Sequence, residues 1–121
     1  MAFVNDGRTW VDGAAFACSV SRRDGYCAVQ LEGELDVAAK PTLDQALEAA
    51  LELEAPEVAL DLKGVTFADS TAVAWLLAAD RRIRTAGGQL RLVDCSPAVR
   101  QLLRLTGVDG LLPAVERGSR P

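Results

Sequence analysis

Hydrophobic and polar positions alternate near the start of the chain. Phe16, Cys18 and Val20 form one apolar face, and a second alternating run covers residues 27–31. The two runs are separated by Asp24-Gly25, a dipeptide that is typical of a tight hairpin turn. The pattern therefore predicts an antiparallel β-hairpin.

After the hairpin, the apolar positions change to a helical period. The segment "GELD", residues 33–36, is expected to be a loop, and a helix is predicted from about Pro41 to Leu53. Pro41 suits the first turn of a helix, because its missing N–H would have no helical partner there. The compact apolar run "EVALDL", residues 57–62, is typical of a buried central strand.

The second half of the chain repeats this exchange of helix and strand. The predicted elements are a helix over about 71–86 that ends at Gly87-Gly88, a strand over 89–93, a helix from Ser96-Pro97 to Gly107, and a last edge strand over 111–115. The resulting order is β-β-α-β-α-β-α-β. It predicts an α/β fold with helices packed on a mixed, mostly parallel sheet of four to five strands.

The length of 121 residues fits one domain. We expect this domain to cover residues 14–116. Residues 1–13 are predicted to be an N-terminal extension with a short strand near Trp10, and residues 117–121 a flexible tail.

Charge and composition narrow the classes of function. The formal net charge is −4, whereas nucleic acids and anionic membranes attract basic surfaces. We interpret the arginine clusters at 22–23 and 81–84 as solvated faces. No apolar stretch reaches the length of about 18 residues that a membrane helix needs, and the N-terminus lacks a signal-peptide pattern. We therefore expect no binding to nucleic acid or membranes.

Cysteine and histidine usage narrows the chemistry further. Cys18, Cys27 and Cys95 are odd in number and show no CxxC spacing. We interpret them as buried, reduced thiols of a cytoplasmic protein, with a bridge between Cys18 and Cys27 as the less favoured alternative. The chain has no histidine, the commonest general base and metal ligand. We therefore predict no metal site and no cofactor.

The connection between the central strand and the following helix carries the candidate chemistry. It reads Asp69-Ser70-Thr71, and these side chains have three interpretations. One of them caps the helix; Ser70 is a nucleophile activated by Lys40 or Lys63; or Ser70 accepts a phosphate. Neither a G-x-S-x-G elbow nor a phosphate-binding P-loop is present. The residues of this connection alone favour the cap and leave the other two open.

Three separated motifs resemble the STAS domain family, the bacterial anti-sigma factor antagonists. They are "GELD" at 33–36, "DLKGVTFADSTAVAWL" at 61–76 and "GGQLRLVDCSPAVRQLLRLTG" at 87–107. The resemblance covers nearly all of residues 15–115 and implies the STAS fold, in agreement with the order of predicted elements.

The resemblance also implies a function. Ser70 is the position that an anti-sigma factor with serine kinase activity phosphorylates in the family. The unphosphorylated protein would bind that kinase, which binds ATP itself, and so free a sigma factor for transcription. A PP2C-like phosphatase would reset the switch. The protein would thus be the substrate of an enzyme rather than an enzyme. We also expect it to be a monomer or a weak dimer.

The expected partner-binding surface follows from the same resemblance. It comprises Asp36, Asp69, Thr71, Ala72, Val73 and Trp75. Ala72 and Ala74 replace the glycines that are usual in the family, which strengthens the helix and thickens a surface that a partner approaches. Trp75 has two interpretations, packing in the core or an exposed aromatic anchor for the partner.

Two other functions compete with the phosphorylation switch. The first is a scaffold subunit of a stress-sensing complex or of a lipid ABC transporter, since some STAS proteins lack the switch. Such a subunit would purify in a large complex, and Ser70→Ala would be silent. The second is a small hydrolase that uses Ser70, which a serine-reactive probe would label.

Overall fold

The computed structural model describes residues 3–4, 7–12 and 15–107. Its elements in chain order are β1 (Phe3–Val4), β2 (Gly7–Asp12), β3 (Phe16–Arg23), β4 (Tyr26–Leu35), the 3-10 helix η1 (Val37–Ala39), α1 (Lys40–Glu52), β5 (Glu57–Ala68), α2 (Ser70–Thr85), β6 (Gln89–Cys95) and α3 (Pro97–Thr106). Each helix and strand predicted before residue 107 is present. The predicted strand over 111–115 lies outside the described residues.

The strands form one mixed sheet in the order β1-β2-β3-β4-β5-β6. The pairs from β1 to β4 are antiparallel, and β5 pairs in parallel with both β4 and β6. The predicted α/β fold with a mixed sheet is confirmed. The described residues form six strands rather than four to five, and only the pairs β4–β5 and β5–β6 are parallel, so the expectation of a mostly parallel sheet is wrong. The predicted strand near Trp10 is β2, which pairs with β3 over its whole length. This N-terminal segment adds two strands to the sheet.

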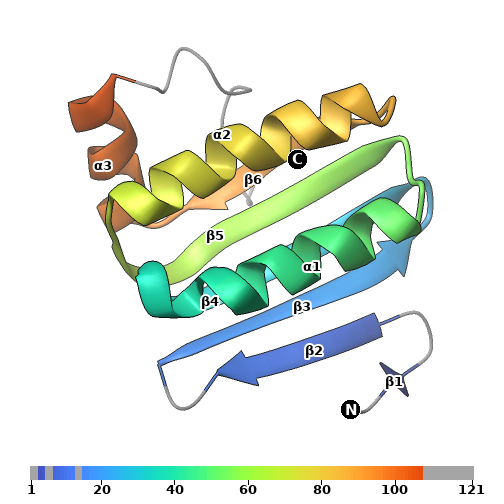
Figure 1. Ribbon diagram of the computed structural model, residues 1–121, viewed down its shortest axis with the longest axis horizontal. Helices are drawn as coiled ribbons and strands as arrows, with labels where there is room; N and C mark the ends of the chain where they lie inside the picture. The colour runs from blue at the N-terminus through green and yellow to red at the C-terminus, as the bar shows by residue number, and fades with distance from the viewer. Residues whose placement is uncertain (1–2, 5–6, 13–14, 108–121) are drawn as a thin grey trace.

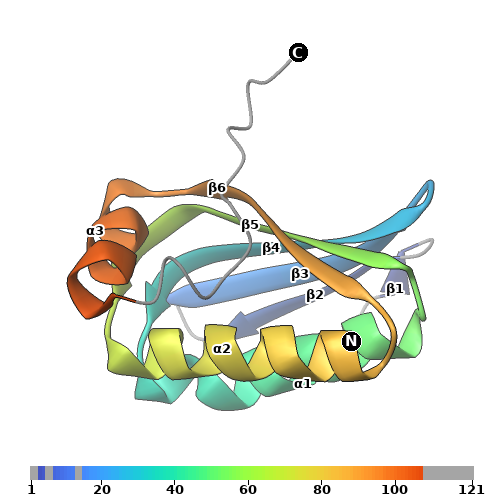
Figure 2. The ribbon, with the colours of Figure 1, turned by 90° about the horizontal axis from the view of Figure 1, so that it is seen from above.

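Two helices cover one face of the sheet (Figures 1 and 2). Alternate side chains of the strands point toward α1 and α2, and large residues such as Leu31, Leu60 and Leu92 are fully buried there. α1 presents Leu43, Leu47 and its alanines to this layer, as its helical period predicts. α3 packs mainly against β5 and lies at the end of the sheet where α2 begins.

The expectation of a loop over "GELD" is wrong for its first three residues. Gly33 to Leu35 continue β4, because β5 runs on beside them to Ala68 and supplies hydrogen-bond partners. The predicted end of β5 at residue 62 is therefore also too early. Gly33 has a φ of 103°, and the Glu34 N–H donates to Ala15 O at 2.8 Å. Leu35 is buried, which anchors the extended strand end.

Candidate functional site

Ser70 is the first residue of α2, directly after the end of β5. The helix is capped by Asp69, whose Oδ1 accepts the Thr71 N–H at 2.9 Å and whose carbonyl oxygen accepts the Ala72 N–H at 2.9 Å. Asp69 has extended backbone geometry, as an N-cap residue requires. Because Asp69 performs the capping, the Ser70 side chain remains exposed, and no described residue hydrogen-bonds its hydroxyl.

The structure brings the end of β4 beside this helix start. Leu35 pairs with Ala68, and the Asp69 N–H donates to Leu35 O at 3.4 Å. Asp36 follows Leu35 and caps η1, its Oδ1 accepting the Ala38 N–H at 3.0 Å. Figure 1 shows η1 next to the junction between β5 and α2. Two N-capping carboxylates, Asp36 and Asp69, thus lie on neighbouring connections.

Two exposed hydrophobic side chains border this junction. Val37, in η1, is 71% exposed, and Phe67, near the end of β5, is 47% exposed. Sequence reasoning did not identify either residue. Val37 follows the motif "GELD", and Phe67 lies in an apolar run that indicated burial. A signal was available for Phe67, because it neighbours the polar "DST" turn, but its outward direction depends on the extension of β5.

Three residues of the expected partner surface are buried. Trp75 is only 5% exposed and joins the core cluster, so its interpretation as an exposed anchor is wrong and core packing is confirmed. Ala72 also packs in that cluster, and Val73 is buried. These side chains are buried because α2 packs against β5, β6 and α1. Ala74 is exposed, so an alanine thickens the helix surface only at that position.

Among the described residues, no base forms a hydrogen bond with the Ser70 hydroxyl. Lys40 Nζ pairs with Asp44 at 2.7 Å, and Lys63 Nζ pairs with Asp61 at 3.5 Å. Both lysines that were candidates for a Ser-Lys pair therefore have other partners. No group of three potential metal ligands occurs among residues whose positions are described. No helix in that part of the chain is long and apolar enough to cross a membrane.

A family model adds independent evidence. The model described as "Mlab, STAS domain" matches residues 18–113. This range contains all three motifs and both connections around Ser70. The chain belongs to the STAS domain family. The expected family resemblance is thereby confirmed.

Individual proteins agree with this family. Over 101 residues, the STAS domain is 31% identical to the anti-sigma-F factor antagonist RsfA of Mycobacterium tuberculosis, covering 82% of this chain and 79% of that protein. The solved structure of an anti-sigma factor antagonist from Mycobacterium paratuberculosis aligns with a TM-score of 0.75 at 28% identity, covering 88% of this chain and 90% of the other.

A more distant structure shows the same fold. The Bacillus cell fate determinant SpoIIAA, solved in its phosphorylated form, aligns with a TM-score of 0.65 at 19% identity. The alignment covers 85% of this chain and 92% of that one. The STAS architecture is therefore retained across chains with few identical residues.

Proposed function

We propose that this protein is an anti-sigma factor antagonist whose binding surface is switched by phosphorylation of Ser70. In the unphosphorylated state it binds an anti-sigma factor that is also a serine kinase. The sigma factor that this kinase had held is then released. The kinase then phosphorylates Ser70 and the complex separates. A PP2C-like phosphatase removes the phosphate and restores binding.

The observation that carries this proposal is the exposed, unbonded hydroxyl of Ser70 at the start of α2. A kinase needs a hydroxyl that its own base and the γ-phosphate of ATP can reach. In the transfer, the bond from Ser70 Oγ to phosphorus forms as the bond to ADP breaks, and the hydroxyl proton passes to a base of the kinase. The capping by Asp69 keeps the hydroxyl available for this reaction.

The surface around Ser70 has the composition of a protein contact. Val37 in η1 and Phe67 near the end of β5 offer exposed apolar area on the elements next to Ser70, and Asp36 and Asp69 add negative charge. Exposed aromatic side chains commonly contribute much of the binding energy in protein interfaces. A partner with an apolar depression and nearby basic side chains would complement this surface.

A phosphate on Ser70 would change binding more than folding. It adds about 1.5 to 2 negative charges at pH 7. The free N–H groups and the positive dipole end of α2 tolerate an anion at this place. In a docked complex, the same phosphate would lie next to the carboxylate of Asp69 and would have to lose its water. This repulsion and crowding disfavour the complex while the domain stays folded.

Named relatives support the proposal. RsfA carries the name anti-sigma-F factor antagonist and resembles this chain over four fifths of its length. SpoIIAA has been solved in a phosphorylated form on the same fold. A protein with this fold can therefore carry a phosphate and remain folded.

The test combines the purified protein with serine-kinase anti-sigma factors encoded in the same genome and with ATP. We expect intact mass spectrometry to show one added phosphate, absent in Ser70→Ala and retained in Thr66→Ala, a matched change at an exposed hydroxyl on β5. Calorimetric titration should show that the phosphorylated protein binds the kinase about a hundredfold more weakly or worse. Circular dichroism should be unchanged.

Substitutions of the apolar rim test the surface separately. Phe67→Ala should weaken kinase binding by at least about tenfold, whereas Arg23→Ala, at the opposite end of the sheet, should leave the affinity unchanged. A protein that takes up no phosphate with any of these kinases, and that purifies in a large complex insensitive to Ser70→Ala, would instead support the scaffold function.

A further inference from the structure

The arginine cluster in the second half of α2 is only partly neutralised by neighbouring acids. Arg82 Nη1 pairs with Glu48 of α1 at 2.6 Å, and Arg84 Nη2 pairs with Asp80 at 2.6 Å. Arg81 is exposed, and no ion pair among the described residues involves its guanidinium. One of these three positive charges is therefore available to a binding partner.

Arg81 lies on the same side of α2 as Ser70. It follows Ser70 by 11 residues, which corresponds to three helical turns with a deviation of about 20°. At about 1.5 Å per residue, the two positions are about 16 Å apart along the helix axis. Ala74 is exposed between them, and Leu77 and Ala78 are partly exposed. A continuous outer face of α2 thus joins the candidate phosphorylation site to the unpaired arginine.

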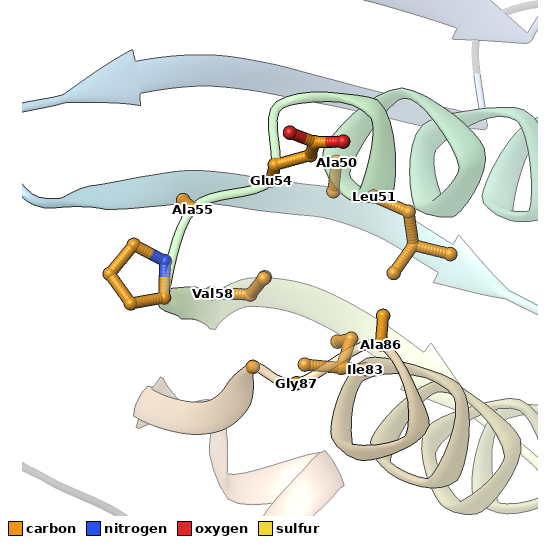
Figure 3. A pocket seen from close by; sticks show the side chains of 10 residues that line it. Ala50, Leu51, Glu54, Ala55, Val58, Ile83, Ala86 and Gly87 are labelled. Atoms are coloured by element: carbon orange, nitrogen blue, oxygen red, sulfur yellow. The ribbon is translucent and has the colours of Figure 1, made fainter.

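The opposite side of α2 faces the core. Ile83 is buried and lines, together with Leu51 of α1 and Val58 of β5, a surface pocket between the ends of the two helices (Figure 3). Arg81 precedes Ile83 by two residues and is therefore turned about 200° away from it around the helix. Figure 2 shows the sheet on one side of α2 only. Replacing the Arg81 side chain should therefore leave the packing of the core unchanged.

The two ends of this outer face carry opposite charge. Asp36 and Asp69 lie at the Ser70 end, where their carboxylates cap η1 and α2, and Arg81 lies toward the other end. A partner with the complementary charges would bind in one orientation along α2, because the reverse orientation brings like charges together. The partner that fits this surface has basic groups near Ser70 and an acidic group about 16 Å away.

We propose that Arg81 is a docking contact for the anti-sigma factor kinase, which meets it with a carboxylate. This inference rests on the proposed function and adds a second contact to the same complex. The kinase lies along the outer face of α2, with its active site at Ser70 and an acidic side chain at Arg81. The contact orients the protein substrate and takes no part in phosphate transfer. Arg81 thus helps to determine which kinase recognises this protein.

The test measures the kinetics of phosphorylation of the full-length protein by the co-encoded kinase that modifies Ser70. Arg81→Gln should raise the KM for the protein substrate roughly three- to tenfold and leave kcat unchanged, because the contact is equally strong before and during the transfer. Arg81→Glu should raise KM further, since it brings two negative charges together. Arg23→Gln changes an exposed arginine at the end of β3 and should behave as the wild type.

Salt and stability measurements separate a charge contact from a change in structure. High salt should reduce the difference in KM between Arg81→Gln and the wild type, because exposed charges are then screened. Circular dichroism and the urea midpoint should be the same for both proteins. A difference in KM that persists at high salt, or an equal rise in Arg23→Gln, would reject the contact.

The outcomes also distinguish this contact from the phosphorylation switch itself. If Ser70 is phosphorylated and Arg81→Gln has the KM of the wild type, the docking contact is rejected and the proposed function stands. A lower kcat with unchanged KM would equally reject docking as the role of Arg81. If none of the kinases phosphorylates Ser70, the proposed function is rejected and the docking contact with it.

Discussion

Gly33 lies where two backbone segments approach too closely for any side chain. A Cβ atom at this position would stand 2.0 Å from Ala15 O and 2.9 Å from the carbonyl carbon of that residue. The φ of 103° is also unfavourable for other residues. The glycine allows β4 to continue into the segment that ends beside Ser70. Gly33 thus contributes to the placement of the strand end beside Ser70.

Gly33→Ala is expected to lower the free energy of unfolding by more than about 2 kcal/mol, because both the clash with rigid backbone and the positive φ oppose the new methyl group. Urea denaturation followed by circular dichroism measures the loss. Gly25→Ala is the matched control: its φ is 87°, but no atom lies within 4 Å of the added Cβ. It should cost only about 1 kcal/mol. Equal losses in the two variants would contradict the role of the close contact.

At the scale of elements, α2 connects the two ends of the molecule. Its start carries the Asp69 cap and Ser70, and its inner face carries Trp75 and Leu76. Its end lines a surface pocket together with the end of α1. The inner face packs against the sheet and against α1. The helix therefore positions Ser70 through buried contacts and not through the cap alone.

Trp75→Ala is expected to reduce the free energy of unfolding by about 3–5 kcal/mol, since it removes a large buried side chain and leaves a cavity. Ala74→Gly, at the exposed neighbouring position, should cost about 1 kcal/mol through helix propensity alone. Chemical denaturation of both variants provides the comparison. A Trp75→Ala protein as stable as the wild type would restore the interpretation of an exposed anchor.

At the scale of the whole molecule, the three cysteines report on the integrity of the core. Cys18, Cys27 and Cys95 come from three different strands, and all are free and buried. Burial raises the pKa of the Cys18 thiol to about 12 and that of the Cys27 thiol to about 11, from 9.0 in the unfolded chain. Burial likewise raises the pKa of the Cys95 thiol to about 11. These thiols are therefore protonated and unreactive while the protein is folded.

This difference makes stability sensitive to alkaline pH. Above pH 9.0 the unfolded chain loses thiol protons that the folded protein keeps, so the free energy of unfolding should fall as the pH rises from 9 to 11. Cys18→Ala should make this fall shallower in urea titrations at each pH. At pH 8, a thiol reagent should label the native protein slowly and the denatured protein at all three sites. Rapid labelling of the native protein would contradict the buried placement.

Much of the site was predictable from short-range patterns. The hairpin, the three helices and the cap at Ser96 follow from periodicity and polar side chains within a few residues. The sequence also indicated a cap within Asp69-Ser70-Thr71, and the structure identifies Asp69 as the capping residue. The motif that contains Ser70 was equally visible. The exposure of Phe67 and the burial of Trp75 were not predictable in this way. Both residues have apolar neighbours in the sequence, and which of these side chains face solvent depends on how β5 and α2 pack against the rest of the fold.

The sequence by itself determined the order of helices and strands, the family and the residue that is the candidate for phosphorylation. These depend on local hydrogen bonds and on the spacing of apolar side chains, which act within one segment. Only the tertiary structure decided how far β4 and β5 extend, which side chains surround Ser70, and where a pocket forms at the other end of α2. Strand length and burial depend on segments from distant parts of the chain. A local pattern does not show which of these segments will pair with a strand or pack against a side chain.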